Sequence, residues 1–284
     1  MLSLGLDLSE RPAHAVVIDE AGEVVARGTG ADAAEAVRAA AHSRPTDVAG
    51  VAMFSDAKDE PAVAGVKAVT RCTPGAAAIA AESWIGAAKG ARNAVCLYIG
   101  DEVFAGLLLD GQPWSGAHGR AGAAGWLALN PVERQDYRKL GSLAAEVSAK
   151  GIARRLSWRV QAGDRSRVLE NAGGSLEAIT GQLVFEGARA GDGVAISVVR
   201  DTAKYIGMAV ANLATMFDPE IIVLGGSIAS SGDIMLEPIR VETMRRVPAQ
   251  MAEQLRVELS TLGDDAVAIG AARSLSSKAA RARA

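Results

Sequence analysis

Two strand-turn-strand patterns restrict the fold of this chain more than any other feature of its sequence. In the first, apolar runs at residues 2–8 and 13–19 flank a polar turn. In the second, the runs are at residues 94–100 and 103–110. Short apolar runs bounded by turn residues are typical of buried strands. The recurrence of such a hairpin predicts an internally duplicated α/β protein with one hairpin in each lobe.

The remaining segments alternate between strand and helix patterns. We predict further strands at residues 23–28, 48–54, 219–227 and 256–260. We predict helices at residues 31–43, 75–90, 140–155, 175–190, 192–217 and 264–277, and another that opens in the stretch MLEPIRVETMRR. We expect an N-terminal lobe of residues 1–112, on which 264–284 packs back, and a C-terminal lobe of residues 113–263.

Composition excludes several classes of protein. A chain of 284 residues with 49% hydrophobic residues can bury a large core. Its net charge of −3 comes from interspersed acidic and basic residues, so we expect no nucleic-acid partner. Cys72 and Cys96 lie too far apart in sequence for a CxxC pair, which excludes a disulfide framework and disfavours a thiolate zinc site. No secretory leader and no long apolar run is visible, so we expect no membrane contact and a cytoplasmic location.

Several sequence blocks carry a family resemblance. They are the opening GLDL hairpin, AAESWIGAAKG with the following AVCLYIG, LDGQPWSGAHGRAG, LVFEGARAGD and DPEIIVLGGS. In these blocks and their order the chain resembles the ROK family (repressors, open reading frames and kinases), whose enzymes are sugar kinases. The resemblance implies the two-lobed actin/hexokinase-type (ribonuclease H-like) α/β fold and a homodimer.

The first phosphate turn departs from the family pattern. Family kinases open with D-[LI]-G-G-T, of which this chain keeps Asp7 and Leu8 and replaces the rest by Ser9, Glu10 and Arg11. A phosphate-binding turn needs small residues, because backbone N–H groups must close on the phosphate oxygens. The resemblance therefore implies that this cradle is lost.

The second phosphate turn and the catalytic base are changed too. The family's G-T-G turn is Gly100, Asp101 and Glu102 here, which brings two negative charges to a phosphate site. Phosphoryl transfer needs a carboxylate that accepts the sugar hydroxyl proton. In the family this base is the Asp of an N-D pair, and the matching residues here are Thr73 and Pro74. Proline cannot act as a base, so we expect no catalytic residue at Pro74.

The sugar and zinc motifs are also altered. The family's G-E-I-G-H supplies a sugar-binding Glu and a zinc-binding His, and residues 122–126 carry GAAGW instead. The family's zinc motif C-x-C-G-x-x-G-C-L-E should follow. Ser142 and Ala144 occupy the places of its last Cys and its Glu. We therefore expect no bound metal.

A few positions could still serve a nucleotide. By family position they are Asp7, Gly100, Gly225, Gly226 and Ser227. Gly225, Gly226 and Ser227 match the family's adenosine-side turn, but a close strand-to-helix connection would require the same glycines.

Two other features have open alternatives. Asp56 and Asp59 are either a substitute for the missing base or the tip of a charged loop. His118, in a glycine-rich loop, is either a ligand contact or a solvated side chain.

Our hypothesis from the sequence is a ROK-like protein that has lost sugar kinase activity, needs no cofactor, and has a binding or interaction role with an unknown ligand. The alternative is a divergent ATP-dependent hexose or N-acetylhexosamine kinase that uses ATP and magnesium. A sugar-responsive repressor is disfavoured, since family repressors carry a helix-turn-helix ahead of the GLDL strand and that strand begins at residue 2 here.

Overall fold

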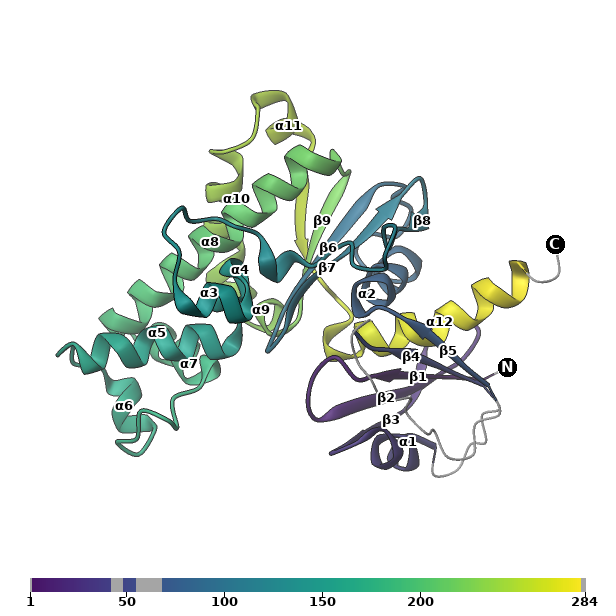
Figure 1. Ribbon diagram of the computed structural model, residues 1–284, viewed down its shortest axis with the longest axis horizontal. Helices are drawn as coiled ribbons and strands as arrows, with labels where there is room; N and C mark the ends of the chain where they lie inside the picture. The colour runs from purple at the N-terminus through teal and green to yellow at the C-terminus, as the bar shows by residue number, and fades with distance from the viewer. Residues whose placement is uncertain (1, 42–47, 55–67, 282–284) are drawn as a thin grey trace. The chain divides into compact units, whose positions relative to one another are not determined.

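The computed structural model describes residues 2–41, 48–54 and 68–281, with only the backbone described at Val48, Ala68 and 275–281 (Figure 1). The chain divides into two compact units. Unit 1 comprises Met1–Cys96, Ala105–Gly122 and Ser260–Ala284, and unit 2 comprises Leu97–Phe104 and Ala123–Leu259. The lobe boundaries expected from the sequence stay a prediction.

Unit 1 is built on a five-stranded sheet in the order β3-β2-β1-β4-β5. Its central strand β1 pairs antiparallel with β2 and parallel with β4, which in turn pairs parallel with β5. The strands are β1 (Ser3–Asp7), β2 (Ala13–Ile18), β3 (Val24–Gly30), β4 (Val48–Ala52) and β5 (Ala68–Cys72).

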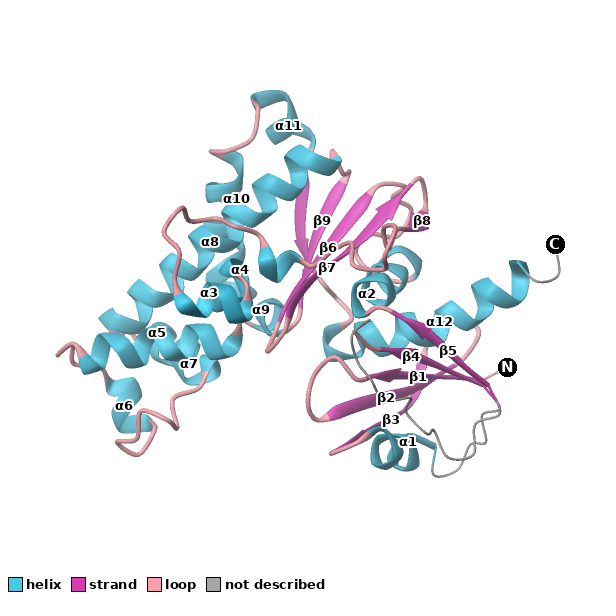
Figure 2. Cartoon of the chain, in the orientation of Figure 1, coloured by secondary structure: helices cyan, strands magenta, loops and turns pink. Residues whose placement is uncertain are grey.

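Helices cover both faces of this sheet (Figure 2). Alternate residues of β2 point to opposite faces: Ala13, Ala15 and Val17 pack with α1 (Ala33–Ala41), and Val16 and Ile18 pack with α12 (Ala266–Arg281) and α2 (Pro74–Trp84).

Helix α12 lies unusually close to the sheet. A Cβ added to Gly5 would lie 1.8 Å from the carbonyl oxygen of Ala268 in this helix. A Cβ added to Gly50 would lie equally close, 1.8 Å, to the Ala271 oxygen. The two glycines are therefore required for the helix to pack against β1 and β4.

A second sheet has the order β10-β9-β6-β7-β8, with β9 and β10 parallel and β7 and β8 antiparallel. Its strands are β6 (Ala94–Ile99), β7 (Val103–Leu109), β8 (Gln112–Pro113), β9 (Ile221–Gly225) and β10 (Arg256–Leu259). A short 3-10 helix, Gly263–Asp265, belongs to unit 1. The other helices of the described residues belong to unit 2: the 3-10 helix Ala124–Trp126, α3 (Gln135–Leu140), α4 (Ser142–Val147), α5 (Ala149–Gln161), α6 (Arg167–Asn171), α7 (Gly181–Arg189), α8 (Gly193–Phe217), α9 (Ser227–Ser230), α10 (Gly232–Met244) and α11 (Ala249–Gln254).

The α/β class is confirmed, and most predicted elements are present with ends shifted by a few residues. The single helix predicted over 140–155 is wrong: α3, α4 and α5 replace it. Gly141, with φ +89°, separates α3 from α4, and a Cβ there would lie 2.3 Å from the Gly125 oxygen. Ser148 is extended and caps α5 by accepting a hydrogen bond from the Gly151 N–H.

Two other predicted bounds differ from the structure, and one strand is additional. The helix predicted from residue 175 begins at Gly181. The one predicted to residue 90 ends at Trp84. Strand β5 is an element that the sequence analysis did not predict.

Candidate ligand-binding site

Asp7, in the first hairpin, is hydrogen-bonded to another residue of the same turn. Its side chain is buried at the end of β1, and its Oδ1 accepts hydrogen bonds from the Ser9 N–H at 2.8 Å and the Ser9 hydroxyl at 2.6 Å. Burial raises the pKa of Asp7, although the two Ser9 hydrogen bonds and nearby His14 oppose this shift. One carboxylate oxygen of Asp7 is therefore engaged within the turn itself.

His14, opposite Asp7 on β2, belongs to a polar cluster that the sequence analysis did not identify. Its Nε2 lies 2.7 Å from Asp265 Oδ1, and Arg27 donates to Asp265 Oδ2 at 2.8 Å. Burial alone would raise the pKa of Asp265, but these two partners lower it. The cluster ties β2 and β3 to the residue preceding α12.

Helix α2 begins where the family resemblance places the catalytic base. Thr73 is its N-cap and accepts a hydrogen bond from the Ala76 N–H at 3.2 Å. Pro74 follows at the first helical position, where its missing N–H costs nothing. A Cβ on Gly75 would lie 2.2 Å from the Ala105 oxygen, so this helix start packs directly against β7. The base position therefore carries no group that can accept a proton.

Glu82 is a fully buried carboxyl further along α2. Its Oε1 accepts a hydrogen bond from Ser260 at 2.5 Å, and its Oε2 accepts one from the Ala87 N–H at 2.9 Å. Burial raises the pKa of Glu82. Because both oxygens are used inside unit 1, this residue has a structural role.

The second phosphate turn meets the glycine turn after β9 within unit 2. Gly226 has φ +76°, and a Cβ on it would lie 2.5 Å from the Ile99 carbonyl oxygen. The Ser227 hydroxyl donates to that same oxygen at 3.2 Å. The Gly100 N–H donates to the Glu102 main-chain oxygen at 3.0 Å, so this N–H is hydrogen-bonded within its own turn. The structure thus brings Gly100 and residues 225–227 together and gives Gly226 a packing role.

The sugar and zinc segment offers no metal-binding donors. Trp126, at the zinc His position, is 58% exposed, and Ser142, at the last Cys position, is buried with an unpaired hydroxyl. Among the residues that the structure describes, no group of three or more His, Cys, Asp or Glu side chains is placed to hold a metal ion. The side chains in this segment therefore do not fit the zinc ion that the resemblance implies.

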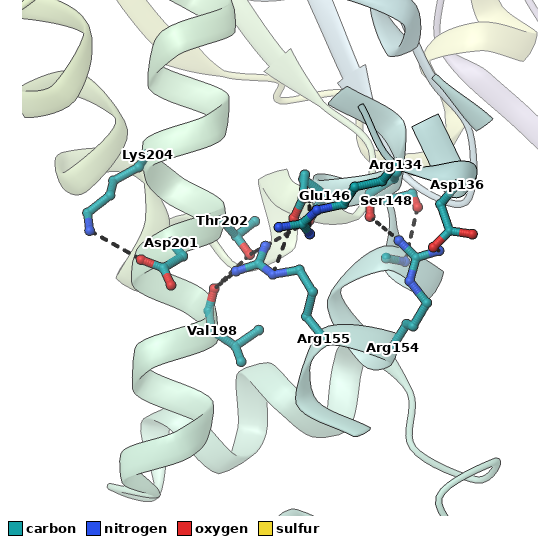
Figure 3. Close-up of polar contacts among 12 residues, drawn as sticks. Arg134, Asp136, Glu146, Ser148, Arg154, Arg155, Val198, Asp201, Thr202 and Lys204 are labelled. Atoms are coloured by element: carbon teal, nitrogen blue, oxygen red, sulfur yellow. Dashed lines mark hydrogen bonds and ion pairs between the residues drawn. The ribbon is translucent and has the colours of Figure 1, made fainter. Parts of the chain in front are cut away.

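Unit 2 also contains a cavity of about 640 Å³ that the sequence analysis did not predict. On its wall, Glu146 from α4 accepts a hydrogen bond from Tyr137 at 2.5 Å and pairs with Arg134 and Arg155 at 3.4 and 3.6 Å (Figure 3). The lining residues are Leu129, Asn130, Pro131, Arg134, Glu146, Arg155, Trp158, Arg159, Val198, Asp201, Lys204, Tyr205, Met208 and Arg246.

Arg155, which lines the cavity, is held by hydrogen bonds to several groups. Arg155 donates to the main-chain oxygens of Glu146 and Val198 at 2.8 and 2.9 Å and to the Thr202 hydroxyl at 3.1 Å. Burial lowers the pKa of Arg155, while Glu146 opposes that shift. This network connects α4, α5 and α8.

Comparison with known proteins identifies the family. The family model described as "ROK family" matches residues 70–278. The chain belongs to the ROK family. Its sequence is 34% identical, over 191 residues, to a glucokinase of Halalkalibacterium halodurans, a match covering 66% of this chain and 58% of that protein. It is 27% identical, over 192 residues, to the xylose repressor of Caldicellulosiruptor bescii, covering 66% of this chain and 47% of the repressor.

The ROK fold is confirmed at the level of structure. A ROK family glucokinase from Streptomyces griseus, solved in complex with glucose and AMPPNP, superposes with a TM-score of 0.85 at 24% identity and covers 96% of this chain and 99% of its own. A ROK hexokinase from Thermus thermophilus superposes with a TM-score of 0.74 at 23% identity, covering 96% and 98%. The matched stretch spans less than two thirds of the glucokinases found by sequence, at 58% and 60% of their length.

The other candidate residues of this ROK chain have different outcomes. Asp56 and Asp59 lie outside the described residues. His118 is exposed in the glycine-rich loop.

No helix in the described part of the chain is long and apolar enough to cross a membrane. The cavity residues escaped prediction because their segments, spread from residue 129 to residue 246, carry charges at spacings typical of solvated helix faces.

Proposed function

We propose that this protein is a sugar-kinase-like ROK member that has lost kinase activity and has a binding or interaction role. The observation that carries the proposal is Pro74 at the first position of α2, in the place of the catalytic base. A general base is worth on the order of a hundred- to ten-thousandfold in rate where the rest of a site is assembled. A proline cannot supply any of it.

The phosphate turns support the same proposal. The Asp7 carboxylate is buried and accepts a hydrogen bond from Ser9, and the Gly100 N–H is hydrogen-bonded within its own turn. Asp101 and Glu102 are both exposed in the second turn, where a phosphate would meet negative charge. We expect ATP to bind weakly or not at all through Asp7, Gly100 and residues 225–227, and we expect no required cofactor.

A coupled assay of ADP release tests the proposal directly. The purified protein is given magnesium, ATP and, in turn, glucose, mannose, N-acetylglucosamine and N-acetylmannosamine, beside an active ROK glucokinase as positive control. We expect no ADP release above the rate without sugar. Sugar-dependent turnover would overturn the proposal.

The alternative is a divergent ATP-dependent hexose or N-acetylhexosamine kinase. The 34% identity to a glucokinase favours it. This alternative requires another carboxylate, for which Asp56 and Asp59 are the candidates. It predicts sugar phosphorylation by the unmutated protein that Asp56→Asn or Asp59→Asn abolishes.

We further propose a cytoplasmic homodimer that binds neither nucleic acid nor membrane. The mixed surface charge supports the absence of a nucleic-acid partner. The xylose repressor among its relatives makes a DNA-binding control worthwhile: the protein should not retard a mixed pool of duplex DNA in a gel at moderate salt.

A further inference from the structure

The unit 2 cavity carries a surplus of positive charge. Five of its lining side chains are cationic and two are carboxylates. Glu146 is shared between Arg134 and Arg155, so this carboxylate balances only one of the two guanidinium charges. Both arginines line the cavity beside it (Figure 3).

A second shared carboxylate lies next to Arg246, another lining residue. Glu242 accepts hydrogen bonds from Arg246 and also pairs with Arg245 at 3.7 Å. Lys204, by contrast, pairs with one carboxylate, Asp201, at 3.2 Å, and the charge of Asp201 also acts on Arg155.

Arg159 is likewise paired one to one, with Asp164. Glu242 lies closer to Arg246 than to Arg245, which does not line the cavity. Among the ion pairs of the described residues, one guanidinium charge at this cavity, of Arg134 or Arg155, is therefore left without a carboxylate of its own.

The rest of the wall suits an organic group. Trp158 on α5 is 43% exposed, and Arg154 covers its ring at 4.8 Å from the centroid. Tyr205, Met208 and Leu129 add further apolar and aromatic surface. A cavity of about 640 Å³ that combines aromatic walls with a few placed charges has the size and character of a small-molecule site.

This cavity is separate from the predicted nucleotide positions of unit 2. None of Gly100, Gly225, Gly226 or Ser227 lines it. Ala144, the position of the zinc motif's Glu on α4, faces the glycine loop, since its Cβ lies 3.1 Å from where a Cβ of Gly125 would be. Glu146, two residues on, lines the cavity instead.

We propose that this cavity binds a small organic phosphate, whose phosphate group takes up the surplus guanidinium charge and whose organic body packs against Trp158. A phosphate monoester carries about −1.5 to −2 charge at pH 7, which is more negative charge than a carboxylate would bring to the arginines of this wall. Arginine also binds phosphate oxygens in a bidentate manner. The proposal goes beyond the proposed function and does not depend on the loss of kinase activity.

Titration calorimetry of the full chain with phenyl phosphate tests the proposal, with inorganic phosphate and phenol as partial probes. We expect a dissociation constant below about 1 mM for phenyl phosphate. Arg134→Gln and Arg246→Gln should each weaken binding about tenfold or more, since each removes a charge-assisted contact. Trp158→Ala should weaken phenyl phosphate binding and leave inorganic phosphate unchanged.

The matched control is Arg256→Gln. Arg256 is an exposed arginine of β10, also in unit 2, with a single long ion pair to Glu258 at 3.5 Å, and it does not line the cavity. Its substitution should leave binding unchanged, and thermal melts should show that all variants fold. The absence of phenyl phosphate binding up to about 10 mM, or binding that survives both cavity arginine substitutions, would overturn the proposal.

Discussion

At the scale of single residues, the proposed loss of activity rests on Pro74, and replacing it tests whether a missing base alone would explain that loss. We predict that Pro74→Asp gives no sugar-dependent ATP turnover, because residues that act as a unit do not contribute additively and the phosphate turns stay altered. An acidic residue is favourable in the first turn of α2, so the variant should fold. Pro74→Asn is the uncharged control. Sugar-dependent ADP release by the Asp variant alone would show that the remaining site is intact.

A second residue-scale prediction concerns Asp7, whose pKa is raised by burial above its ordinary value of about 3.9. The folded state therefore holds this proton more tightly than the unfolded state. The free energy of unfolding contributed by Asp7 is largest below the ordinary pKa and falls as pH rises through the raised one. Asp7→Asn cannot ionise and keeps an oxygen for the Ser9 hydrogen bonds.

The difference in free energy of unfolding between Asp7→Asn and the unmutated protein should therefore shift in favour of the variant as pH rises above about 4. Urea unfolding at several values between pH 4 and pH 7 measures it. Groups that do not interact with Asp7 cancel in the difference, whereas His14, whose charge acts on Asp7, does not. A difference that is constant across this range would contradict the raised pKa of Asp7.

At the scale of elements, the connection from β9 to α9 depends on Gly226. We predict that Gly226→Ala lowers the free energy of unfolding by at least about 2 kcal/mol, because its φ of +76° is strained for alanine and a Cβ would collide with the Ile99 oxygen at 2.5 Å. Gly191→Ala is the matched control, with φ +81° and nothing within 4 Å of an added Cβ. It should cost only about 1 kcal/mol. Equal losses in urea unfolding would contradict the packing role.

Element boundaries show how far local sequence signals reach. The strands of both hairpins are predicted from apolar runs and turn residues alone, and the helix predicted from residue 75 begins one residue earlier, at Pro74. The breaks at Gly141 and Ser148 were missed although both residues are ordinary helix-end signals, because the apolar period continues across them. The cavity could not be predicted, since its charge pattern depends on contacts that bring Arg134, ahead of α3, and Arg155 on α5 to the same Glu146 on α4.

At the scale of the whole molecule, the fold followed from family resemblance and not from periodicity. Apolar runs indicate strands and helices, but sheet order and the close approach of α12 to β1 and β4 depend on contacts between distant segments. Glycines such as Gly5 and Gly50 are uninformative in sequence because the helix that requires them lies more than 200 residues further along.

The last prediction is the homodimer, which we expect to form through unit 2. Its α8 presents Ile196 to solvent, at 37% exposure. Ile196 also lines an apolar groove of about 240 Å³ with Val199 and Ile234. Burying such a surface against a second copy would be favourable. Light scattering at micromolar concentration should therefore give the mass of two chains.

Ile196→Glu should shift that equilibrium toward the monomer, because the interface would have to bury an unpaired charge. Val69→Glu, on an exposed valine of β5 in unit 1, is the control and should leave the dimer intact. A monomeric unmutated protein would contradict the dimer itself. A dimer that Ile196→Glu does not weaken would contradict the α8 surface as its contact.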